Sequence, residues 1–434
     1  MTTLPTFAIE SEPAMGAAVE QLLQMLARAI DSARPETVLP HYLPPVPKGR
    51  TLVLGAGKAA ATMARTLEQH WPAPLSGLVV TAAGYDSPCQ SIDVMLGGHP
   101  LPNQGSLQAA RRLLALARQS TTEDLILMLL SGGGSALLCA PAAGLSLQEK
   151  QSIHQQLIHS GANIREINCV RRHLSAIKGG HLAVACAPAT VHNLIISDVP
   201  GDALPDIASG PTVYDPSSCA EALAIIKRYA IQCSESTHKA LQSGRYETPK
   251  PPQGRFAHVH TQLIATAHQA LSRAQDWAQS QGLKVLNLGD SIQGESREVA
   301  KVMAGIAQSI KKHHTPVAPP CVLLSGGETT VTVRGQGTGG SNAEFLLSLL
   351  HALDGLQGVH ALAADTDGID GAGPVAGAWF NDQSLAKARR LGLFLPDYLD
   401  RNDAHGFFAA LDQQINTGPT HTNVNDFRAL LITH

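Results

Sequence analysis

Two glycine-rich stretches in the second half of the sequence carry residues that can bind anions, hold cations and accept protons. Residues 324–345 begin with Leu-Ser-Gly-Gly-Glu and run through closely spaced glycines, and residues 363–373 place Asp365, Asp367 and Asp370 in a loop after an apolar run. Glycine lets the backbone approach a ligand closely, so that its N–H groups can surround an anion. Clustered carboxylates hold a hard cation or accept a proton. Together the two stretches predict a phosphate-and-metal site in an enzyme that handles phosphoryl groups.

An apolar run followed by small or polar residues occurs repeatedly along the chain. The segments that share this layout are residues 51–60, 125–136, 193–202 and 321–328. In open α/β sheets, ligands bind at the carboxyl ends of the strands, and helix N-termini there favour anions. We therefore expect an α/β protein whose site is built from strand ends.

The first of these segments contains Gly55, Gly57 and Lys58 and superficially matches the dinucleotide-binding fingerprint. A nicotinamide-binding protein also needs an acidic residue at the end of the second strand, where it binds the ribose. The expected second strand, residues 77–83, ends without one. A lysine after the second glycine instead suits a phosphate or a carboxylate. A plain strand–helix turn with a solvated Lys58 is an equally good interpretation.

The second segment has three consecutive glycines between two serines at an expected strand-to-helix junction. It lacks the Gly-Lys-Ser/Thr ending of a Walker A loop and the central serine of a nucleophile elbow. The pattern predicts an oxyanion or phosphate cradle formed by Ser131, Gly132, Gly133, Gly134 and Ser135.

Basic residues near the middle of the chain are candidates for anion binding. A helix expected within residues 168–180 would place Arg171, Ser175 and Lys178 on one face. That face could present cations to a carboxylate or a phosphate, although a solvated basic face is the commoner arrangement. The nineteen histidines show no zinc-site spacing, and His173 on this helix is more often structural than catalytic.

Acidic residues are the candidates for metal binding and proton transfer. The loop after the strand at residues 193–196 carries Asp198, Asp202 and Asp206. Turns and helix caps explain such a loop at least as well as a metal does, and Asp198 is the candidate metal ligand.

Four acidic residues of the glycine-rich stretches 324–345 and 363–373 can be ranked as candidates for a role in the site. Glu328 follows two glycines at a strand end and is expected to contact substrate or phosphate. Asp367 is the first choice for chemistry, Asp365 the second and a candidate metal ligand, and Asp370 the last. At least one of these three aspartates should form an Asx turn.

Length and composition bound the class of protein. The 434 residues are 44% hydrophobic and 15% charged, which suits a compact two-domain protein. A net charge of −3 and the lack of a basic, aromatic-interleaved patch argue against nucleic-acid binding. No signal-peptide pattern or membrane-length apolar run is present, and the seven cysteines form no Cys-x-x-Cys pair. A cytoplasmic protein with reduced thiols is expected.

The order of elements predicts an α/β fold in two domains, residues 1–250 and 256–434, separated by the turn-rich residues 246–254. In the first domain, strands are expected at 51–54, 77–81, 125–130 and 193–196, the last of the series, with helices at 15–32, 58–70, 104–119, 147–160 and 219–229. In the second, strands are expected at 257–265, 284–288, 321–325 and 329–334, with helices at 267–281, 294–311 and 342–354.

The motifs taken together resemble the class II glycerate 2-kinases, whose C-terminal half is the MOFRL domain. The resemblance extends over nearly the whole chain and rests on residues 55–60, 131–137, 172–180, 197–199, 208–212, 325–333, 365–371 and 418–426. It implies a Rossmann-like N-terminal domain, a smaller α/β domain and a site in the cleft between them. The implied reaction is ATP- and Mg²⁺-dependent phosphorylation of D-glycerate at its 2-hydroxyl.

The resemblance also implies roles for single residues. Lys58 and Asp367 match the catalytic lysine and aspartate of that family, and Asn342 matches part of its Gly-Gly-Arg-Asn-Gln-Glu motif. Ser341 stands where the motif has its catalytic arginine, and His421 stands where the family usually has a small residue. Serine cannot bind phosphate bidentately as arginine does. Another cation such as Arg334 or Arg171 could substitute, the substrate could differ from glycerate, or the chain could be a weak enzyme.

Three functions stay open at this point. The first is the glycerate 2-kinase, acting on D-glycerate or a related short hydroxy acid. The second is an NAD(P)H-dependent hydroxypyruvate reductase, a name that some members of the family carry. The third is a catalytically impaired anion-binding homologue. A homodimer is one possible assembly, and the sequence does not fix the oligomeric state.

Overall fold

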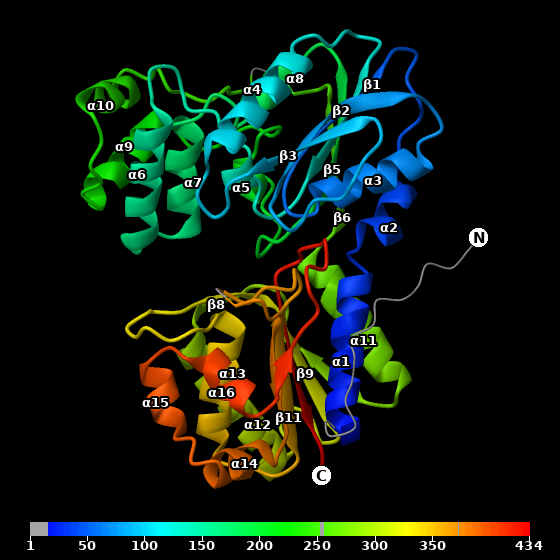
Figure 1. The fold of residues 1–434 in the computed structure, drawn as a ribbon, viewed down its shortest axis with the longest axis vertical. Helices are drawn as coiled ribbons and strands as arrows, with labels where there is room; N and C mark the ends of the chain where they lie inside the picture. The colour runs from blue at the N-terminus through cyan, green and yellow to red at the C-terminus, as the bar shows by residue number, and fades with distance from the viewer. Residues whose placement is uncertain (1–15, 252–255, 372) are drawn as a thin grey trace. The chain divides into compact units, whose positions relative to one another are not determined.

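The computed structural model describes residues 16–251, 256–371 and 373–434 (Figure 1). These residues form two compact units. The central unit comprises residues 38–264, and the terminal unit comprises residues up to 37 together with 265–434. This division differs from the expected domains 1–250 and 256–434, because the first helix belongs with the second half of the chain and residues 256–264 belong with the first half.

The central unit is built on a six-stranded sheet. Its strands, in spatial order, are β3 (Ile92–Gly97), β2 (Leu75–Ala82), β1 (Thr51–Ala56), β4 (Leu125–Leu130), β5 (Thr190–Ile196) and β6 (Val259–Ala265). The pairs β3–β2, β2–β1, β1–β4 and β4–β5 are parallel. This is the strand order of the dinucleotide-binding folds, in which the order reverses between β1 and β4. The predicted Rossmann-like parallel sheet is confirmed. The strand at 193–196 does not end the series, because β6 lies beyond it at the edge.

Helices connect these strands, and capping side chains fix where several of them begin. Asn103, Ser146, Asn163, Ser218 and Ser234 each accept a hydrogen bond from a backbone N–H of the first turn that they precede. The helices are α3 (Ala60–His70), α4 (Gln104–Ala117), α5 (Gly134–Leu137), α6 (Leu147–His159), α7 (Ile164–His173), α8 (His181–Cys186), α9 (Cys219–Arg228) and α10 (Glu235–Gln242), with 3₁₀ turns η2 (Leu39–Tyr42) and η3 (Ile207–Ser209). A short helix, α2 (Pro35–Val38), lies at the boundary between the two units.

The prediction of one helical face bearing Arg171, Ser175 and Lys178 is wrong, because α7 ends at His173. The Ser175 hydroxyl accepts hydrogen bonds from the backbone N–H groups of residues 177 and 178, which replaces the helical pattern with a turn. Two glycines with positive φ then follow at residues 179 and 180. The chain therefore reverses between the arginine and the lysine.

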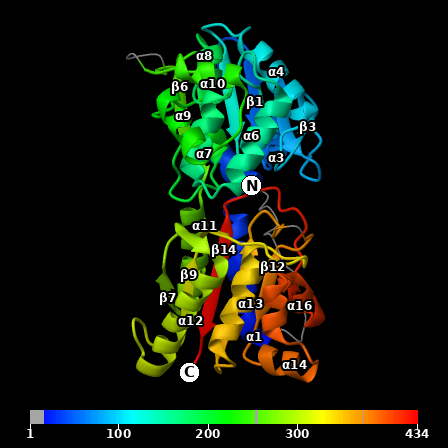
Figure 2. The ribbon, with the colours of Figure 1, turned by 90° about the vertical axis from the view of Figure 1, so that its left-hand side faces the viewer.

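The terminal unit has a mixed sheet whose order does not follow the sequence. Its strands, in spatial order, are β13 (Gln414–Ile415), β12 (Gly377–Phe380), β11 (Val359–Asp365), β14 (Asp426–Ile432), β9 (Cys321–Ser325) and β7 (Lys284–Asn287). Only β7 and β9 run parallel within it. The strand β14, red in Figure 2, lies between β11 and β9 and is buried along its whole length.

Helices of the terminal unit pack on this sheet around a core that includes Phe345, Phe407 and Phe408. The helices are α1 (Gly16–Asp31), α11 (Ala267–Ser280), α12 (Ser296–His313), α13 (Ser341–Leu353), α14 (Ser384–Arg390), α15 (Leu395–Asp400) and α16 (Ala404–Ala410). Helix α1 packs against α11 and β11, which explains why it belongs to this unit (Figure 1). None of the helices in the described ranges is long and apolar enough to cross a lipid bilayer.

The strand expected at residues 329–334 is displaced toward the N-terminus. The observed strand, β10 (Gly327–Thr330), pairs in parallel with β8 (Ile292–Glu295) in a separate two-stranded sheet. Beyond it, the backbone N–H of Thr332 donates to the Glu295 carboxylate (3.0 Å) rather than to a strand partner. A side chain therefore ends the pairing, which alternation of β-branched residues could not reveal.

Candidate active site

The loops after β1 and β4 meet at the point where the strand order reverses. The backbone N–H of Lys58 donates to the Gly132 carbonyl (2.8 Å), and that of Ala59 donates to the Ser131 hydroxyl (3.0 Å). Ser131 is fully buried, so its hydroxyl positions the start of α3 and is not presented to solvent. The Lys58 ammonium lies 5.5 Å from the centre of the Tyr85 ring. Lys58 and the glycine cradle therefore lie side by side in the structure.

The glycine cradle has backbone donors to offer. Gly133 takes a left-handed conformation (φ 79°) at the start of α5. In the described part of the chain, no hydrogen-bond acceptor is found for the N–H groups of Gly132 and Gly133. Two adjacent unused N–H groups beside a lysine form an arrangement that suits a phosphate oxygen. The Ser135 hydroxyl is within 2.8 Å of the Ser209 hydroxyl, which ties the cradle to η3.

Gly57 is required by the close approach of these two loops. A Cβ at this position would lie 2.1 Å from the Ser131 hydroxyl oxygen, and the residue has φ 141°. We expect Gly57→Ala to lower the free energy of unfolding by about 3 kcal/mol, the upper end of the range for backbone strain, because a steric contact is added to it. The urea midpoint measures the change. Gly84→Ala is the control, since Gly84 also has positive φ (85°) but nothing within 4 Å of its Cβ position. Equal losses in the two variants would contradict the steric argument.

Arg171 and Lys178 come together in a cavity of the central unit, although they do not share a helical face. Lys150 and His154 of α6 line the same cavity, as does Ser135 of the glycine cradle. Sequence reasoning missed Lys150 and His154. Their spacing of four residues on one helix was the available signal, because it places both side chains on one face.

The three late aspartates separate into two roles in the terminal unit. Asp365 and Asp367 both form Asx turns: Asp365 Oδ1 accepts from the N–H of Asp367 (2.9 Å), and Asp367 Oδ1 accepts from that of Ile369 (2.8 Å). Asp370 instead accepts from the first-turn N–H groups of Asn342 (3.0 Å) and Ala343 (2.9 Å) at the start of α13. Asp370 therefore holds a helix end, and the Asx-turn prediction is confirmed for both of the other aspartates.

The remaining candidates of the terminal unit lie on α13 and β10. Ser341 is its first residue and is half-buried, and the buried Asn342 amide donates to Asp426 Oδ1 (2.6 Å). Glu328 is exposed on β10. Sequence reasoning missed Asp426 and its partner Arg428, both buried on β14 and joined by an ion pair. Burial raises the pKa of Asp426 to about 6, against the lowering effect of the Arg428 charge.

The acidic loop after β5 is divided between a structural residue and a candidate ligand. Asp206 pairs with the buried Arg172 (3.0 Å) and accepts from the Asn168 amide (3.1 Å), so its role is structural. Asp202 lies in a turn with positive φ (55°). Asp198 follows β5 and is half-buried. It comes at the carboxyl end of a strand next to β4, the strand that carries the glycine cradle.

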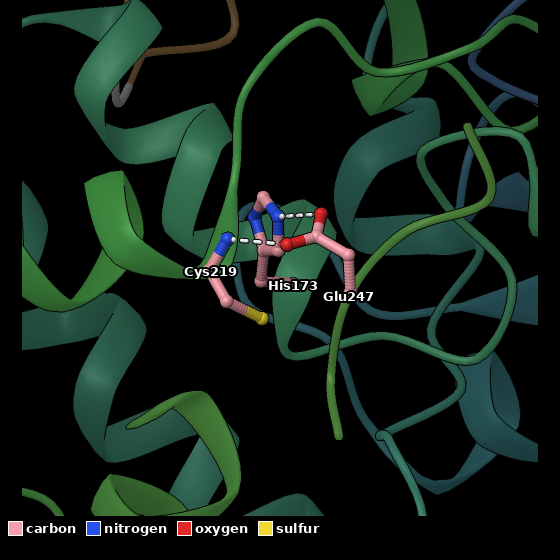
Figure 3. A group of neighbouring side chains, drawn as sticks. All are labelled: His173, Cys219 and Glu247. Carbon is pink, nitrogen blue, oxygen red and sulfur yellow. Dashed lines mark hydrogen bonds and ion pairs between the residues drawn. The ribbon is translucent and has the colours of Figure 1, made fainter. Parts of the chain in front are cut away.

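Within the described residues, one group of three side chains could hold a metal by geometry alone: His173, Cys219 and Glu247 (Figure 3). The Glu247 carboxylate accepts from the Cys219 N–H (2.9 Å) and pairs with His173 (3.2 Å) and Lys250 (3.0 Å). Burial and the Glu247 charge raise the pKa of the Cys219 thiol to about 12. A protonated thiol and a carboxylate already bound to donors are poor metal ligands. We therefore interpret this group as structural: Glu247 links the start of α9 to His173 and Lys250.

The predicted site residues thus fall into two sets, one in each unit. The central unit carries Lys58, the glycine cradle, Asp198, Arg171 and Lys178, and the terminal unit carries Glu328, Ser341, Asn342, Asp365 and Asp367. Backbone donors and cations dominate the first set, whereas carboxylates dominate the second. These are the groups that phosphoryl transfer uses: donors and cations for phosphate oxygens, and carboxylates for a metal ion or a proton.

Comparison with known proteins shows to which family the chain is related. A family model described as a domain of unknown function (DUF4147) matches residues 21–242, and the MOFRL family model matches residues 321–426. The chain is 36% identical to the D-glycerate 2-kinase of Thermotoga maritima, over 93% of this chain and 96% of that protein. The chain belongs to the glycerate kinase family. A crystal structure of a Thermotoga maritima glycerate kinase has a TM-score of 0.85 and 35% identity to it, over 95% of this chain and 99% of that one.

Names within the glycerate kinase family are not uniform. A protein of Agrobacterium vitis provisionally named hydroxypyruvate reductase is 46% identical, over 95% of this chain and 94% of that protein. In this member of the glycerate kinase family, the DUF4147 match begins within α1 and covers most of the central unit, and the MOFRL match lies within the terminal unit. The two matched segments therefore correspond to the two sets of site residues.

Proposed function

We propose that this member of the glycerate kinase family transfers the γ-phosphoryl group of ATP to the 2-hydroxyl of D-glycerate, giving 2-phosphoglycerate. The observation that carries the proposal is the pairing of Lys58 with the unused N–H groups of Gly132 and Gly133 at the point where the strand order reverses. A nicotinamide dinucleotide would also need a carboxylate after the second strand to bind its ribose, and β2 is followed by Ala83 and Gly84 instead. The glycerate kinases among the relatives support the same reaction class.

The residues of the central unit fit a polyphosphate. The N–H groups of Gly132 and Gly133 would donate to phosphate oxygens, and the Lys58 ammonium would neutralise charge that grows on the transferring group. Gly55 and Gly57 keep the backbone of β1 and its following turn close to β4, where a side chain would collide with residues 129 and 131. The cradle is therefore held rigidly by the sheet.

The carboxylates fit a divalent cation and a proton acceptor. Asp198 and Asp365 offer the oxygen ligands that Mg²⁺ prefers. When bound, Mg²⁺ would neutralise the charge of the β- and γ-phosphates. Asp367 would accept the proton of the attacking hydroxyl: its Oδ1 is engaged with the Ile369 N–H, which fixes the orientation of the carboxylate. Glu328, Ser341 and Asn342 would contact substrate or phosphate.

A coupled assay with ATP, Mg²⁺ and D-glycerate tests the proposal, with 2-phosphoglycerate identified directly. Formation of ADP and 2-phosphoglycerate in equal amounts supports it. Turnover with another short hydroxy acid but not with D-glycerate keeps the reaction class and moves the substrate. Absence of turnover with every acid, in a folded protein that still binds ATP, would identify an impaired anion-binding homologue.

Hydroxypyruvate reduction is the second candidate, because of the name carried by the Agrobacterium vitis relative. The strand β2 ends at Ala82 and is followed by Ala83 and Gly84, so no carboxylate is available for a nicotinamide ribose there. Oxidation of NADH or NADPH by hydroxypyruvate in the same preparation, without ATP turnover, would overturn the kinase proposal.

We expect Arg334 to supply the cation that Ser341 lacks. Arg334 is exposed in the loop that leads into α13, and its guanidinium forms no ion pair with the described residues. Arg334→Gln should lower kcat by about 10²-fold or more, and Ser341→Arg should give no gain, because a second guanidinium would be redundant. Steady-state kinetics measures both. A large gain from Ser341→Arg, with Arg334→Gln unchanged, would show an impaired enzyme instead. Arg390→Gln, on the exposed end of α14, is the matched control.

A further inference from the structure

A small cavity of the central unit collects cationic side chains. It has about 30 Å³ of space open to water-sized spheres. Its polar lining includes Lys150, His154, Arg171 and Lys178, and Ser135 connects it to the glycine cradle. The rest of the lining comes from Cys139 and from the apolar residues Pro102, Ala136, Ile153, Leu157, Val170 and Leu174.

The two lysines are buried, with 6% of Lys150 and 1% of Lys178 exposed. Their ammonium groups donate hydrogen bonds to backbone carbonyls: Lys150 to that of Leu174 (2.5 Å), and Lys178 to that of Leu138 (2.9 Å). No carboxylate of the described residues forms an ion pair with either lysine or with Arg171. The acidic group in the lining is the thiol of Cys139. Buried charges in proteins are ordinarily paired, so all three groups can be charged together around this apolar cavity only when an anion is bound.

The Arg171 guanidinium has an N–H donor that no described residue satisfies. Its Nε lies 3.0 Å from His154 Nδ1 and its Nη2 lies 2.9 Å from His154 Nε2. Burial, followed by the charges of Arg171, Lys150 and Lys178, lowers the pKa of His154 to about 3, so the imidazole is neutral. A neutral imidazole has one acceptor nitrogen and can satisfy one of these two guanidinium donors. The other remains available to a ligand oxygen.

We propose that this cavity binds the carboxylate of the hydroxy-acid substrate and selects acids over uncharged alcohols. The proposal rests on the proposed function and identifies where the acid group is recognised. The free space fits a carboxylate: one water needs about 10–15 Å³, so the cavity holds two or three non-hydrogen atoms, whereas a phosphoryl group has four. Ser135 lines the cavity and also ends the phosphate cradle, which puts the acid group next to the phosphoryl site.

The same arrangement predicts proton uptake when an acid binds. Burial lowers the pKa of Lys178 to about 7 and that of Lys150 to about 8, with a further lowering from neighbouring cations. A bound carboxylate favours the charged ammonium and raises both values. At pH 8, the lysines are partly neutral without ligand and become protonated with it, so binding takes protons from the buffer.

Calorimetric titration of the full chain with D-glycerate, without ATP, tests the proposal directly. In buffers of different ionisation enthalpy, the observed enthalpy at pH 8 should vary in the direction of proton uptake. Lys178→Met should raise the dissociation constant and the KM for D-glycerate by about 100-fold, with a much smaller change for ATP, because a charged hydrogen-bond donor is lost. The melting temperature of the variant is measured alongside, to show that it stays folded although the Leu138 carbonyl loses its donor. Lys227→Met, on the exposed end of α9, is the control.

The outcomes separate this proposal from the proposed function. Kinase activity with an unchanged KM for D-glycerate in both Lys178→Met and Lys150→Met would overturn the carboxylate cavity and leave the kinase intact. Calorimetric binding of D-glycerate that Lys178→Met abolishes, in a protein without kinase activity, would support the cavity and overturn the kinase. Equal affinity for glycerol and D-glycerate would also overturn the cavity. Stronger competition by inorganic phosphate than by acetate would reassign it to a phosphoryl group.

Discussion

Lys58→Met is expected to lower kcat for phosphoryl transfer by roughly 10³-fold, the range found when one donor to developing charge is removed. Methionine keeps the length and the apolar stem of the side chain and removes only the ammonium. The loop geometry should survive, because the contact between Lys58 and Gly132 is made by the backbone. Steady-state kinetics and the melting temperature, measured on the same preparation, check both statements.

The division of the effect between kcat and KM shows what Lys58 does. Loss of a group that acts on the transition state lowers kcat, whereas loss of a group that binds ground-state phosphate raises the KM for ATP and leaves kcat unchanged. We expect the first pattern. Lys227→Met again serves as the control for loss of a lysine charge. An unchanged kcat in Lys58→Met would return this lysine to the interpretation of a solvated turn residue.

Asp367→Asn is expected to lower kcat by about 10³-fold, within the range for loss of a general base. The substitution is conservative for the fold. The Asx turn needs an acceptor at Oδ1 for the Ile369 N–H, and the asparagine carbonyl oxygen supplies one. The melting temperature should therefore change little, and the loss should be chemical.

A magnesium titration separates the two roles open to Asp367. If its carboxylate holds the cation, excess Mg²⁺ should recover part of the lost rate. If it accepts the proton, Mg²⁺ should have no effect, which is the result we expect. Asp276→Asn, exposed on α11, is the matched control. Loss of stability comparable to the loss of rate would show that Asp367 is structural.

Local signals in the sequence were sufficient for the elements of the central unit and insufficient for the sheet of the terminal unit. Strands β1 and β4 are largely apolar runs, β5 ends in one, and all three are followed by turn residues, which indicates buried parallel strands directly. In the terminal unit, β12 follows β11 and β14 follows β13 without a helix between them, and β14 pairs with strands far apart in sequence. Pairing of this kind depends on tertiary contacts, which a local pattern does not encode.

Local sequence signals also predict only some of the side chains of the candidate site. The glycine cradle could be predicted, because glycines at a strand-to-helix junction have few other uses. Lys178 was expected on the wrong element and still reaches the cavity with Arg171, because the turn at Ser175 reverses the chain. Asp426 and Arg428 lie inside an apolar strand, and only their burial together identifies them as an ion pair.

The central position of β14 affects how the chain can fold during synthesis. Residues 38–264 leave the ribosome as one continuous segment and can complete their sheet early. Helix α1 is made first, but its partners α11 and β11 come more than two hundred residues later. Strand β14 is made after β9 and β11, which it joins. A nascent chain therefore holds an unpaired gap in this sheet until Asp426 arrives beside Asn342. Translation pauses upstream of residue 426 would lengthen the time for which chaperones must protect the two open strand edges.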